Sequence, residues 1–248
     1  MPRVLYTLIV LFTDFGTADP YVGQLHAVLA RAAPRAKVID LLHSVPNFDI
    51  RAGAYLLPAL AAEFPVGTVF VGVVDPGVGG DRLPVMIQAD GRWYVGPDNG
   101  LFQIVARRAR RVESWTITWR PQQLSASFHG RDLFAPVAAR LARGDWPASV
   151  PAPLTAPDGD WPDDLPAIVY IDHYGNAITG LRAGQVEAAG TLAVAGRQLQ
   201  HAAVFSAVAP NMPFWYENSV GLVEIAVNRG DASHALELKI GDPVQVVA

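Results

Sequence analysis

Residues 68–74 form an unbroken apolar run (TVFVGVV) rich in β-branched side chains, and Asp75 follows directly. Such a run is typical of a strand whose two faces are both buried, as in a parallel sheet with helices on either side. The preceding sequence fits such a sheet, because apolar runs alternate there with stretches of helical periodicity. These are the apolar runs 4–12 and 37–42 and the helical stretches 21–29 and 50–64. The N-terminal part is therefore predicted to be an α/β layered domain with a mostly parallel sheet.

The next segments predict how this sheet is extended. Two apolar segments, 83–89 and 93–95, flank Asp90-Gly91, a two-residue turn signal that favours an antiparallel hairpin. Helical periodicity returns at 101–108 and 133–143. We expect the hairpin to join the sheet and these two stretches to be helices.

A proline-rich stretch then separates two kinds of pattern. Residues 145–166 contain six prolines, which remove backbone donors and exclude a regular helix. After it come short apolar segments separated by Gly, Asn and Asp, at 167–171, 191–195, 222–227 and 243–247. The chain is predicted to comprise an α/β domain (1–144), a linker (145–166) and a small all-β barrel domain (167–248).

Composition excludes several classes of function. The chain of 248 residues has a net charge of −4 with scattered basic residues, so it lacks the positive surface of a nucleic-acid-binding protein. It has no cysteine, which excludes disulfides, thiolate catalysis and thiolate metal sites. No segment has the ~20 apolar residues of a membrane span, and we interpret 4–12 as a first strand and not a signal peptide. A hydrophobic content of 51% favours an oligomer, and we expect it to be soluble and cytoplasmic.

Polar residues follow the predicted strands, which is where ligands bind in an open α/β sheet. Asp14, in Thr13-Asp14-Phe15-Gly16, could accept hydrogen bonds from a ribose diol, or could cap the next segment. Asp19 precedes Pro20 at a predicted helix start, where a capping role is the alternative. Both aspartates are candidate binding residues.

A second group of polar residues surrounds Asp75. Three glycines lie between Asp75 and Arg82, but the loop lacks the spacing of a phosphate-binding loop. A guanidinium seven residues from Asp75 would keep that carboxylate ionised and oriented, or would simply close the turn. His129-Gly130 precedes a predicted helix, whose free backbone amides suit a water, hydroxide or halide ion, although a lone histidine can also be structural.

In the C-terminal part, two clusters combine aromatic rings with amides: residues 172–176 (DHYGN) and 215–219 (WYENS). Such groups suit stacking on a purine and recognition of its edge. Two ordinary β-turns are the alternative.

Taken in order, these segments resemble the SAM hydroxide adenosyltransferases, which hydrolyse S-adenosyl-L-methionine (SAM) and are related to the SAM-dependent fluorinase and chlorinase. The resemblance spans nearly the whole chain. The matching motifs are TDFG (13–16), HSVP (43–46), VDPGVG (74–79), GPDNG (96–100), FHGRD (128–132), DHYGN (172–176) and NS (218–219).

The resemblance implies that water attacks C5′ of SAM and yields adenosine and methionine, with SAM as the substrate and no cofactor or metal. It implies that Asp75, Arg82 and His129 orient and activate the water. It also implies a homotrimer whose sites lie between one subunit's N-terminal domain and its neighbour's C-terminal domain. The residues that it places around the substrate are Asp14 and Phe48 at the ribose, Asp19, Tyr21, Asp172, Tyr216 and Ser219 at the methionine part, Asn176, Phe205 and the backbone at Asn228 and Arg229 at adenine, and Gly130 beside the nucleophile.

The sequence departs from the fluorinase pattern at four positions. Tyr21 replaces a serine and Val220 an arginine, both among the methionine contacts. Asp75 stands where halogenases have tyrosine, and Gly130 stands where fluorinase has its halide-binding serine.

Three other functions remain possible from the sequence: a halogenase, a non-catalytic SAM or adenosine sensor, and a metal-dependent hydrolase using Asp14, Asp75, Asp98 and His129. An anionic Asp75 would repel a halide, and no paired metal-ligand spacing occurs in the sequence.

Overall fold

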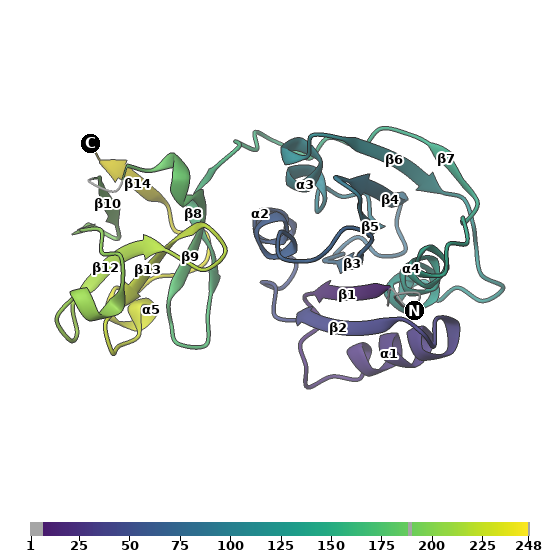
Figure 1. Ribbon diagram of the computed structural model, residues 1–248, viewed down its shortest axis with the longest axis horizontal. Helices are drawn as coiled ribbons and strands as arrows, with labels where there is room; N and C mark the ends of the chain where they lie inside the picture. The colour runs from purple at the N-terminus through teal and green to yellow at the C-terminus, as the bar shows by residue number, and fades with distance from the viewer. Residues whose placement is uncertain (1–6, 188–189, 248) are drawn as a thin grey trace, which may run out of the picture. The chain divides into compact units, whose positions relative to one another are not determined.

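The computed structural model describes residues 7–187 and 190–247, so residues 4–6 of the predicted first strand lie outside the described residues. The chain divides into two compact units, one formed by 1–57 and 63–158 and the other by 58–62 and 159–248 (Figure 1). The elements up to residue 151 are β1 (Leu8–Thr13), α1 (Tyr21–Ala32), β2 (Lys37–Leu42), α2 (Ile50–Ala61), β3 (Val69–Val73), β4 (Pro84–Ala89), β5 (Arg92–Pro97), α3 (Gln103–Arg108), β6 (Val112–Ile117), a π-helical turn (Gly130–Phe134), α4 (Ala135–Ala142) and β7 (Ser149–Pro151).

The first unit is built on a seven-stranded sheet with the order β2-β1-β3-β5-β4-β6-β7. β2, β1, β3 and β5 are parallel neighbours, and β4, β6 and β7 each pair antiparallel with the strand before them in this order. Because β6 is antiparallel to β4, it runs in the same direction as β5, so most strands share one direction. The predicted α/β class with a mostly parallel sheet is confirmed, as is the hairpin around Asp90-Gly91.

The proline-rich stretch differs from its prediction. Residues 149–151, inside the predicted linker, form β7, which pairs with β6 at the edge of the sheet. Proline is tolerated at an edge because its missing donor faces away from the ladder. The strand β6 was not predicted either, and part of the expected linker therefore belongs to this sheet.

The central strands β1 and β3 are buried on both faces, as their apolar runs predict. One face packs against α1 and α4 (Figure 1), through Ile9, Leu11, Val71, Leu25, Leu29 and Val137. On the other face, a Cβ atom at Gly72 would lie 2.8 Å from the ring of Phe102, so only glycine lets this ring pack directly on β3. Helices thus cover both sides of the parallel strands.

The carboxyl ends of β1, β2 and β3 meet at one edge of the sheet, because these strands are parallel neighbours. Asp14 follows β1, His43 follows β2, and Asp75 lies two residues after the end of β3. This edge is where an open α/β sheet places its ligands.

The second unit contains two antiparallel sheets, with the orders β12-β13-β9-β8 and β11-β10-β14. Single bridges join Ala167 to Pro243 and His201 to Trp215, and thus connect the edges of the two sheets. Their inward-facing side chains form one core that includes Ile168, Leu192 and Ile225. The elements are β8 (Leu165–Ile171), β9 (Ala177–Arg182), β10 (Thr191–Val194), β11 (Arg197–Leu199), β12 (Pro213–Glu217), β13 (Leu222–Val227), α5 (Ala232–Ala235), β14 (Val244–Val247) and two 3-10 turns (Ala183–Gln185 and Phe205–Ala207).

This C-terminal β architecture agrees with the prediction, but its details differ. The alternative interpretation of residues 215–219 as a turn is wrong for 215–217, which lie in β12. The strands β9 and β11 and the short helix α5 were not predicted. None of the helices in the described ranges is long and apolar enough to cross a membrane.

Candidate active site

A cleft of about 480 Å³ opens at the carboxyl edge of the sheet in the first unit. It collects residues from the loops after β1, β2 and β3 and from the segment before α4. Among the predicted site residues, it brings together Asp14, Asp19, Tyr21, Phe48, Asp75, His129 and Gly130. Segments that are far apart in the sequence therefore converge on one cavity.

Asp75 is held by Arg82 at the base of this cleft. The Nε atom of Arg82 donates to both carboxylate oxygens at 3.0 and 3.1 Å, and Nη2 donates to Oδ2 at 2.5 Å. The two side chains are only 4% and 10% exposed, so this is a buried, bidentate ion pair. The loop reaches this geometry through Gly79, which has φ +81° and lies so close to the Ala126 carbonyl that a Cβ atom would clash.

His129 completes this cluster from a distant part of the chain. Its Nδ1 atom lies 2.8 Å from Nη2 of Arg82, and the π-helical turn that begins at Gly130 follows it directly. Burial lowers the pKa of His129, and the positive charge of Arg82 lowers it further. His129 is therefore a neutral imidazole at neutral pH.

Asp14 links two of the loops. Its Oδ2 atom accepts a hydrogen bond of 3.0 Å from the backbone N–H of Phe48, so Asp14 does not act as the local cap that was the alternative. Burial raises the pKa of the Asp14 carboxyl, and the charge of Asp75 raises it further, although the Phe48 N–H opposes this. Phe48 itself is 70% exposed and has φ +65°, an unusual backbone conformation for an aromatic residue.

Aromatic rings form one wall of the cleft. The Tyr21 ring lies 5.9 Å from that of Phe15 and 5.4 Å from that of Phe128. A Cβ atom at Gly130 would lie 3.3 Å from the Phe15 ring, so the wall closes tightly over this glycine. Asp19 lies at the rim, and no side-chain hydrogen bond caps α1, whose cap residue is Pro20. The interpretation of Asp19 as a helix cap is wrong.

The carboxylate of Asp98 is used elsewhere. It accepts hydrogen bonds from the backbone N–H and the hydroxyl of Thr155, the latter at 2.7 Å. Across residues 7–187 and 190–247, no group of three or more His, Asp or Glu side chains is arranged so that it could hold a metal ion.

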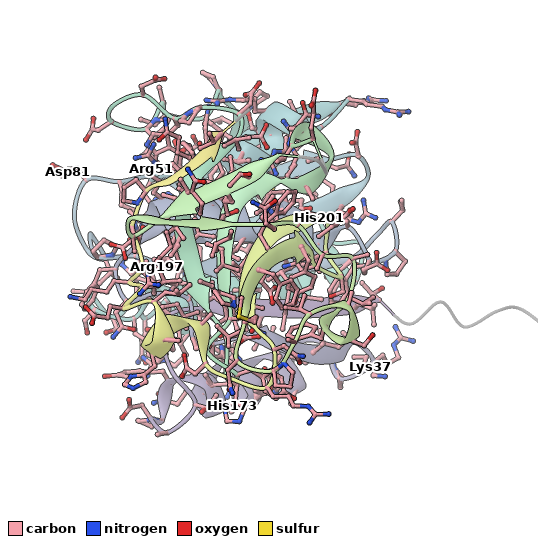
Figure 2. All side chains as sticks on the ribbon, turned by 90° about the vertical axis from the view of Figure 1, so that its left-hand side faces the viewer. Lys37, Arg51, Asp81, His173, Arg197 and His201 are labelled. Atoms are coloured by element: carbon pink, nitrogen blue, oxygen red, sulfur yellow. The ribbon has the colours of Figure 1, made fainter. Side chains whose placement is uncertain are left out.

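The predicted site residues of the second unit lie in two places. Asp172 and Asn176 form one turn between β8 and β9, in which Asp172 Oδ1 accepts from the Asn176 N–H at 2.8 Å and Oδ2 accepts from its side-chain amide at 3.0 Å. His173, in the same turn, is exposed (Figure 2). The Asp172 carboxylate is thus oriented by its own turn.

Tyr216 lies in β12 and faces a buried acid on β13. Its hydroxyl donates to Glu224, whose other oxygen accepts from the Asn218 amide at 2.9 Å. Burial raises the pKa of Glu224, although both hydrogen bonds oppose this. The Phe205 ring packs 5.3 Å from that of Tyr216.

The remaining predicted residues follow strands β12 and β13. Asn228 is buried and donates to the Val208 carbonyl at 2.5 Å, whereas Arg229 is exposed with φ +59°. Ser219 is exposed just after β12.

Sequence reasoning missed several residues that line the cleft in the first unit. Each of them lies within three residues of a predicted residue, so their position in or beside the motifs was the available signal. They are Phe15, Gly16, Asn47, Val73, Val78, Ser127 and Phe128. Glu224 was missed because a single acid within the apolar run 222–227 gives no sign of its partners.

Comparisons with known proteins match both parts of the chain. Residues 9–150 match the model of the SAM hydroxide adenosyltransferase N-terminal domain, and residues 166–245 match that of the C-terminal domain. An (R)-S-adenosyl-L-methionine hydrolase from Thermus thermophilus is 42% identical over 95% of this chain and 97% of its own length. A protein of the same name from Salinispora arenicola is 39% identical over 95% of this chain and 96% of its own length.

More distant relatives and solved structures extend this comparison. A fluorinase from Actinopolyspora mzabensis is 24% identical over 96% of both chains. The crystal structure of an uncharacterized conserved protein from Thermotoga maritima superposes with a TM-score of 0.83 at 30% identity and covers 97% of this chain and 100% of its own.

Proposed function

The chain belongs to the SAM hydroxide adenosyltransferase family and acts on SAM as a hydrolase, and we propose that the reaction takes place in the cleft of the first unit. Water attacks C5′ of SAM, a C–O bond forms, and the electron pair of the C5′–S bond leaves with sulfur. The products are adenosine and L-methionine, and one proton is released. Because the sulfonium is already a good leaving group, the main task of the protein is to position the water and to exclude bulk solvent.

The charge of the cleft suits this substrate. Asp14, Asp19 and Asp75 line it, and no Lys or Arg is among the described residues that do so. Arg82, which does not line the cleft, neutralises the charge of Asp75. The lining therefore keeps a net negative charge from Asp14 and Asp19. A sulfonium cation is attracted to such a cleft, whereas an anion is repelled.

The water is held by Asp75 and His129. The guanidinium of Arg82 fixes the Asp75 carboxylate, which retains lone pairs that can accept a proton from the water. Neutral His129 accepts from Arg82 through Nδ1, so its Nε2–H is a donor that can orient the water oxygen. The contact among these three side chains is the observation that carries the proposed mechanism.

The ribose is held by Asp14 and packs against Phe48. The carboxylate of Asp14 can accept hydrogen bonds from both ribose hydroxyls, and the exposed ring of Phe48 lies at the mouth of the same cleft. Asp19 and Tyr21, at the rim, are proposed to lie near the methionine part.

A halogenase is the nearest alternative, and the cleft argues against it. A chloride or fluoride ion beside Asp75 would face a carboxylate at close range. Incubation with SAM and halide, followed by chromatography, should yield adenosine and no halonucleoside. A halonucleoside as the main product would favour the alternative, and tight SAM binding without turnover would favour a sensor.

The role of Asp75 is tested by its isosteric amide. Asp75→Asn should lower kcat by about 10²- to 10⁴-fold, the usual contribution of a positioned proton acceptor, while SAM still binds. Asp81→Asn is the matched control, because Asp81 lies in the same loop but is exposed (Figure 2). Wild-type turnover by Asp75→Asn would contradict the assignment.

The stereochemistry of the substrate is a finer part of the proposal. Two relatives at 42% and 39% identity are named for the (R) form of SAM. We propose the same preference here, in which the configuration at sulfur decides whether C5′ can lie in line with the water. Separate turnover measurements with the two sulfonium epimers should show faster hydrolysis of the (R) epimer, and equal rates would contradict this preference.

The contribution of the second unit is also part of the proposal. Asp172, Tyr216 and Ser219 are proposed to contact the methionine part, and Asn176, Phe205, Asn228 and Arg229 the adenine, in a cytoplasmic homotrimer that pairs each N-terminal domain with a neighbour's C-terminal domain. A molar mass of three chains in solution would support the trimer, and a monomeric active enzyme would contradict it.

We further propose that the two C-terminal sheets form a closed barrel. Support comes from the bridges between Ala167 and Pro243 and between His201 and Trp215, which connect both pairs of sheet edges. Slow amide exchange at Ile168 and Trp215, whose N–H groups donate across these edges, would support closure. Fast exchange at both would contradict it.

A further inference from the structure

A chain of hydrogen bonds runs beneath the turn that carries Asp14. Its outer end is the contact between His26 of α1 and Asp40 of β2, with Nε2 of the ring 2.8 Å from Oδ1. The same carboxylate oxygen lies 3.0 Å from Nε2 of His43, and Nδ1 of His43 lies 2.8 Å from the Thr13 hydroxyl. The Thr13 oxygen then accepts from the backbone N–H of Phe15 at 3.2 Å. This series of hydrogen bonds therefore ends on the turn that carries Asp14.

The directions of these bonds follow from the chemistry of the groups. A carboxylate only accepts, so Nε2 of His43 carries a proton and donates to Asp40. With His43 in its neutral form, Nδ1 accepts from the Thr13 hydroxyl, and the Thr13 oxygen remains free to accept from the Phe15 N–H. Each donor in this chain then meets an acceptor, and Asp40 selects the tautomer of His43.

The backbone ties the same turn to the loop after β2. The N–H of Gly16 donates to the His43 carbonyl at 2.6 Å, and the N–H of Val45 donates to the Thr13 carbonyl at 3.2 Å. Thr13 is fully buried and His43 is 5% exposed, so water does not compete for their hydrogen bonds. The hydrogen bonds of Thr13 and His43 thus form a buried support for residues 13–16.

We propose that His43 and Thr13 are positioning residues that hold the Asp14 turn in the geometry needed to bind the ribose of the substrate. This rests on the proposed function, in which Asp14 accepts hydrogen bonds from the ribose hydroxyls. Neither residue lines the cleft; both act through the backbone of the turn. The outer contact contributes little, because His26 and Asp40 are 39% and 46% exposed.

The test compares two ligands, adenosine and 2′,3′-dideoxyadenosine, which lacks the ribose hydroxyls. Wild-type protein should bind adenosine more tightly, and Asp14→Ala should remove this difference. Thr13→Val keeps the shape of the side chain but removes the hydroxyl, so it should weaken adenosine binding about tenfold and leave dideoxyadenosine within about twofold. Thr13→Ser restores the hydroxyl and should recover most of the lost affinity.

Thr179 provides a matched control for a loss of stability alone. It is also fully buried, and its hydroxyl donates to the Val223 carbonyl and accepts from the N–H two residues later, at Leu181. Thr179→Val should therefore lower the thermal midpoint as Thr13→Val does, without changing the ratio of the two dissociation constants. His43→Phe should reproduce the effect of Thr13→Val on this ratio, and His26→Ala should leave it unchanged.

The outcomes separate this inference from the function on which it rests. If wild type prefers adenosine and Thr13→Val keeps the full preference, His43 and Thr13 do not position the turn. Equal affinity of wild type for both nucleosides would instead contradict the role of Asp14 at the ribose, and would overturn this inference with it.

Discussion

The Nη2 atom of Arg82 lies 2.8 Å from Nδ1 of His129. A guanidinium can only donate, so this ring nitrogen is an acceptor, and the proton of the neutral ring is on Nε2. A protonated His129 would place two donors opposite each other. Arg82 thus sets both the orientation of Asp75 and the protonation state of His129.

This contact predicts how the reaction depends on pH. Burial, followed by the charge of Arg82, lowers the pKa of His129 below its ordinary value of about 6.5. The kcat/KM for SAM should therefore stay constant from pH 8 to pH 6.5 and fall only at lower pH, as His129 becomes protonated. Arg82→Met should move the midpoint of this fall to higher pH. A midpoint above 6.5 in wild type would contradict the prediction.

The free energy of unfolding should also depend on the protonation of His129, in a direction set by its lowered pKa. Because the pKa of His129 is lower in the folded than in the unfolded state, the unfolded chain binds more protons near pH 6. The contribution of His129 is fully present above about pH 6.5 and is lost as the pH falls through the lowered pKa. Denaturant unfolding at pH 7.5 and 5.5 should therefore show a smaller loss of stability for His129→Gln than for wild type, and equal losses would be inconsistent with the lowered pKa.

Arg82→Lys should damage catalysis even though it keeps the positive charge. The planar guanidinium of Arg82 contacts Asp75 through both Nε and Nη2, and its Nη2 also contacts His129. A single ammonium group cannot reproduce these contacts. We expect kcat to fall by about tenfold or more, because a misplaced water loses its in-line geometry. Arg197→Lys is the control, since Arg197 is exposed in the second unit (Figure 2). Unchanged kcat in Arg82→Lys would show that charge alone is sufficient.

Phe48→Gly should weaken the binding of SAM without lowering the stability of the protein. Phe48 has φ +65°, a backbone conformation that costs a non-glycine residue about 1–2 kcal/mol, and its exposed ring gains little from packing. Glycine relieves this strain, partly offset by the greater freedom of the unfolded chain. The variant should be at least as stable as wild type in denaturant unfolding but should have a higher KM for SAM. Phe48→Ala should show the same KM without the gain in stability, and a less stable glycine variant would contradict the strain at this position.

Glu224→Gln should change how stability depends on pH. Burial raises the pKa of Glu224 even though Tyr216 and Asn218 donate to it, so the folded state binds a proton more tightly than the unfolded state. Its stabilising contribution is fully present below about pH 4.5 and is lost as the pH rises through the folded-state pKa. Thermal midpoints between pH 4.5 and 8 should therefore fall less with rising pH in Glu224→Gln than in wild type. Parallel curves would contradict the raised pKa.

Long buried strands and local pairings were predictable from the sequence. The runs that became β1 and β3 are continuous and apolar, and the ion pair of Asp75 with Arg82 follows from their separation of seven residues. The strands β6 and β12 were missed because charged, aromatic and apolar residues are mixed in them, as expected for strands with partly exposed faces.

Contacts that depend on strand order could not be predicted from the sequence. The link from Asp40 through His43 to Thr13 forms because β2 pairs with β1, and a run of residues does not show which strand lies beside it. The approach of His129 to Arg82 spans 47 residues and was expected only from the family resemblance. Contacts between residues so far apart in the sequence can be predicted only from a structure or from a known relative.

In the proposed site, the acidic lining of the cleft also affects how the reaction ends. The substrate enters as a sulfonium cation, but once the C5′–S bond breaks, sulfur is an uncharged thioether. The attraction to Asp14, Asp19 and Asp75 is then lost, while adenosine and zwitterionic methionine carry no net charge. Bond cleavage itself therefore weakens the hold on the products, and turnover should continue with little product inhibition by methionine.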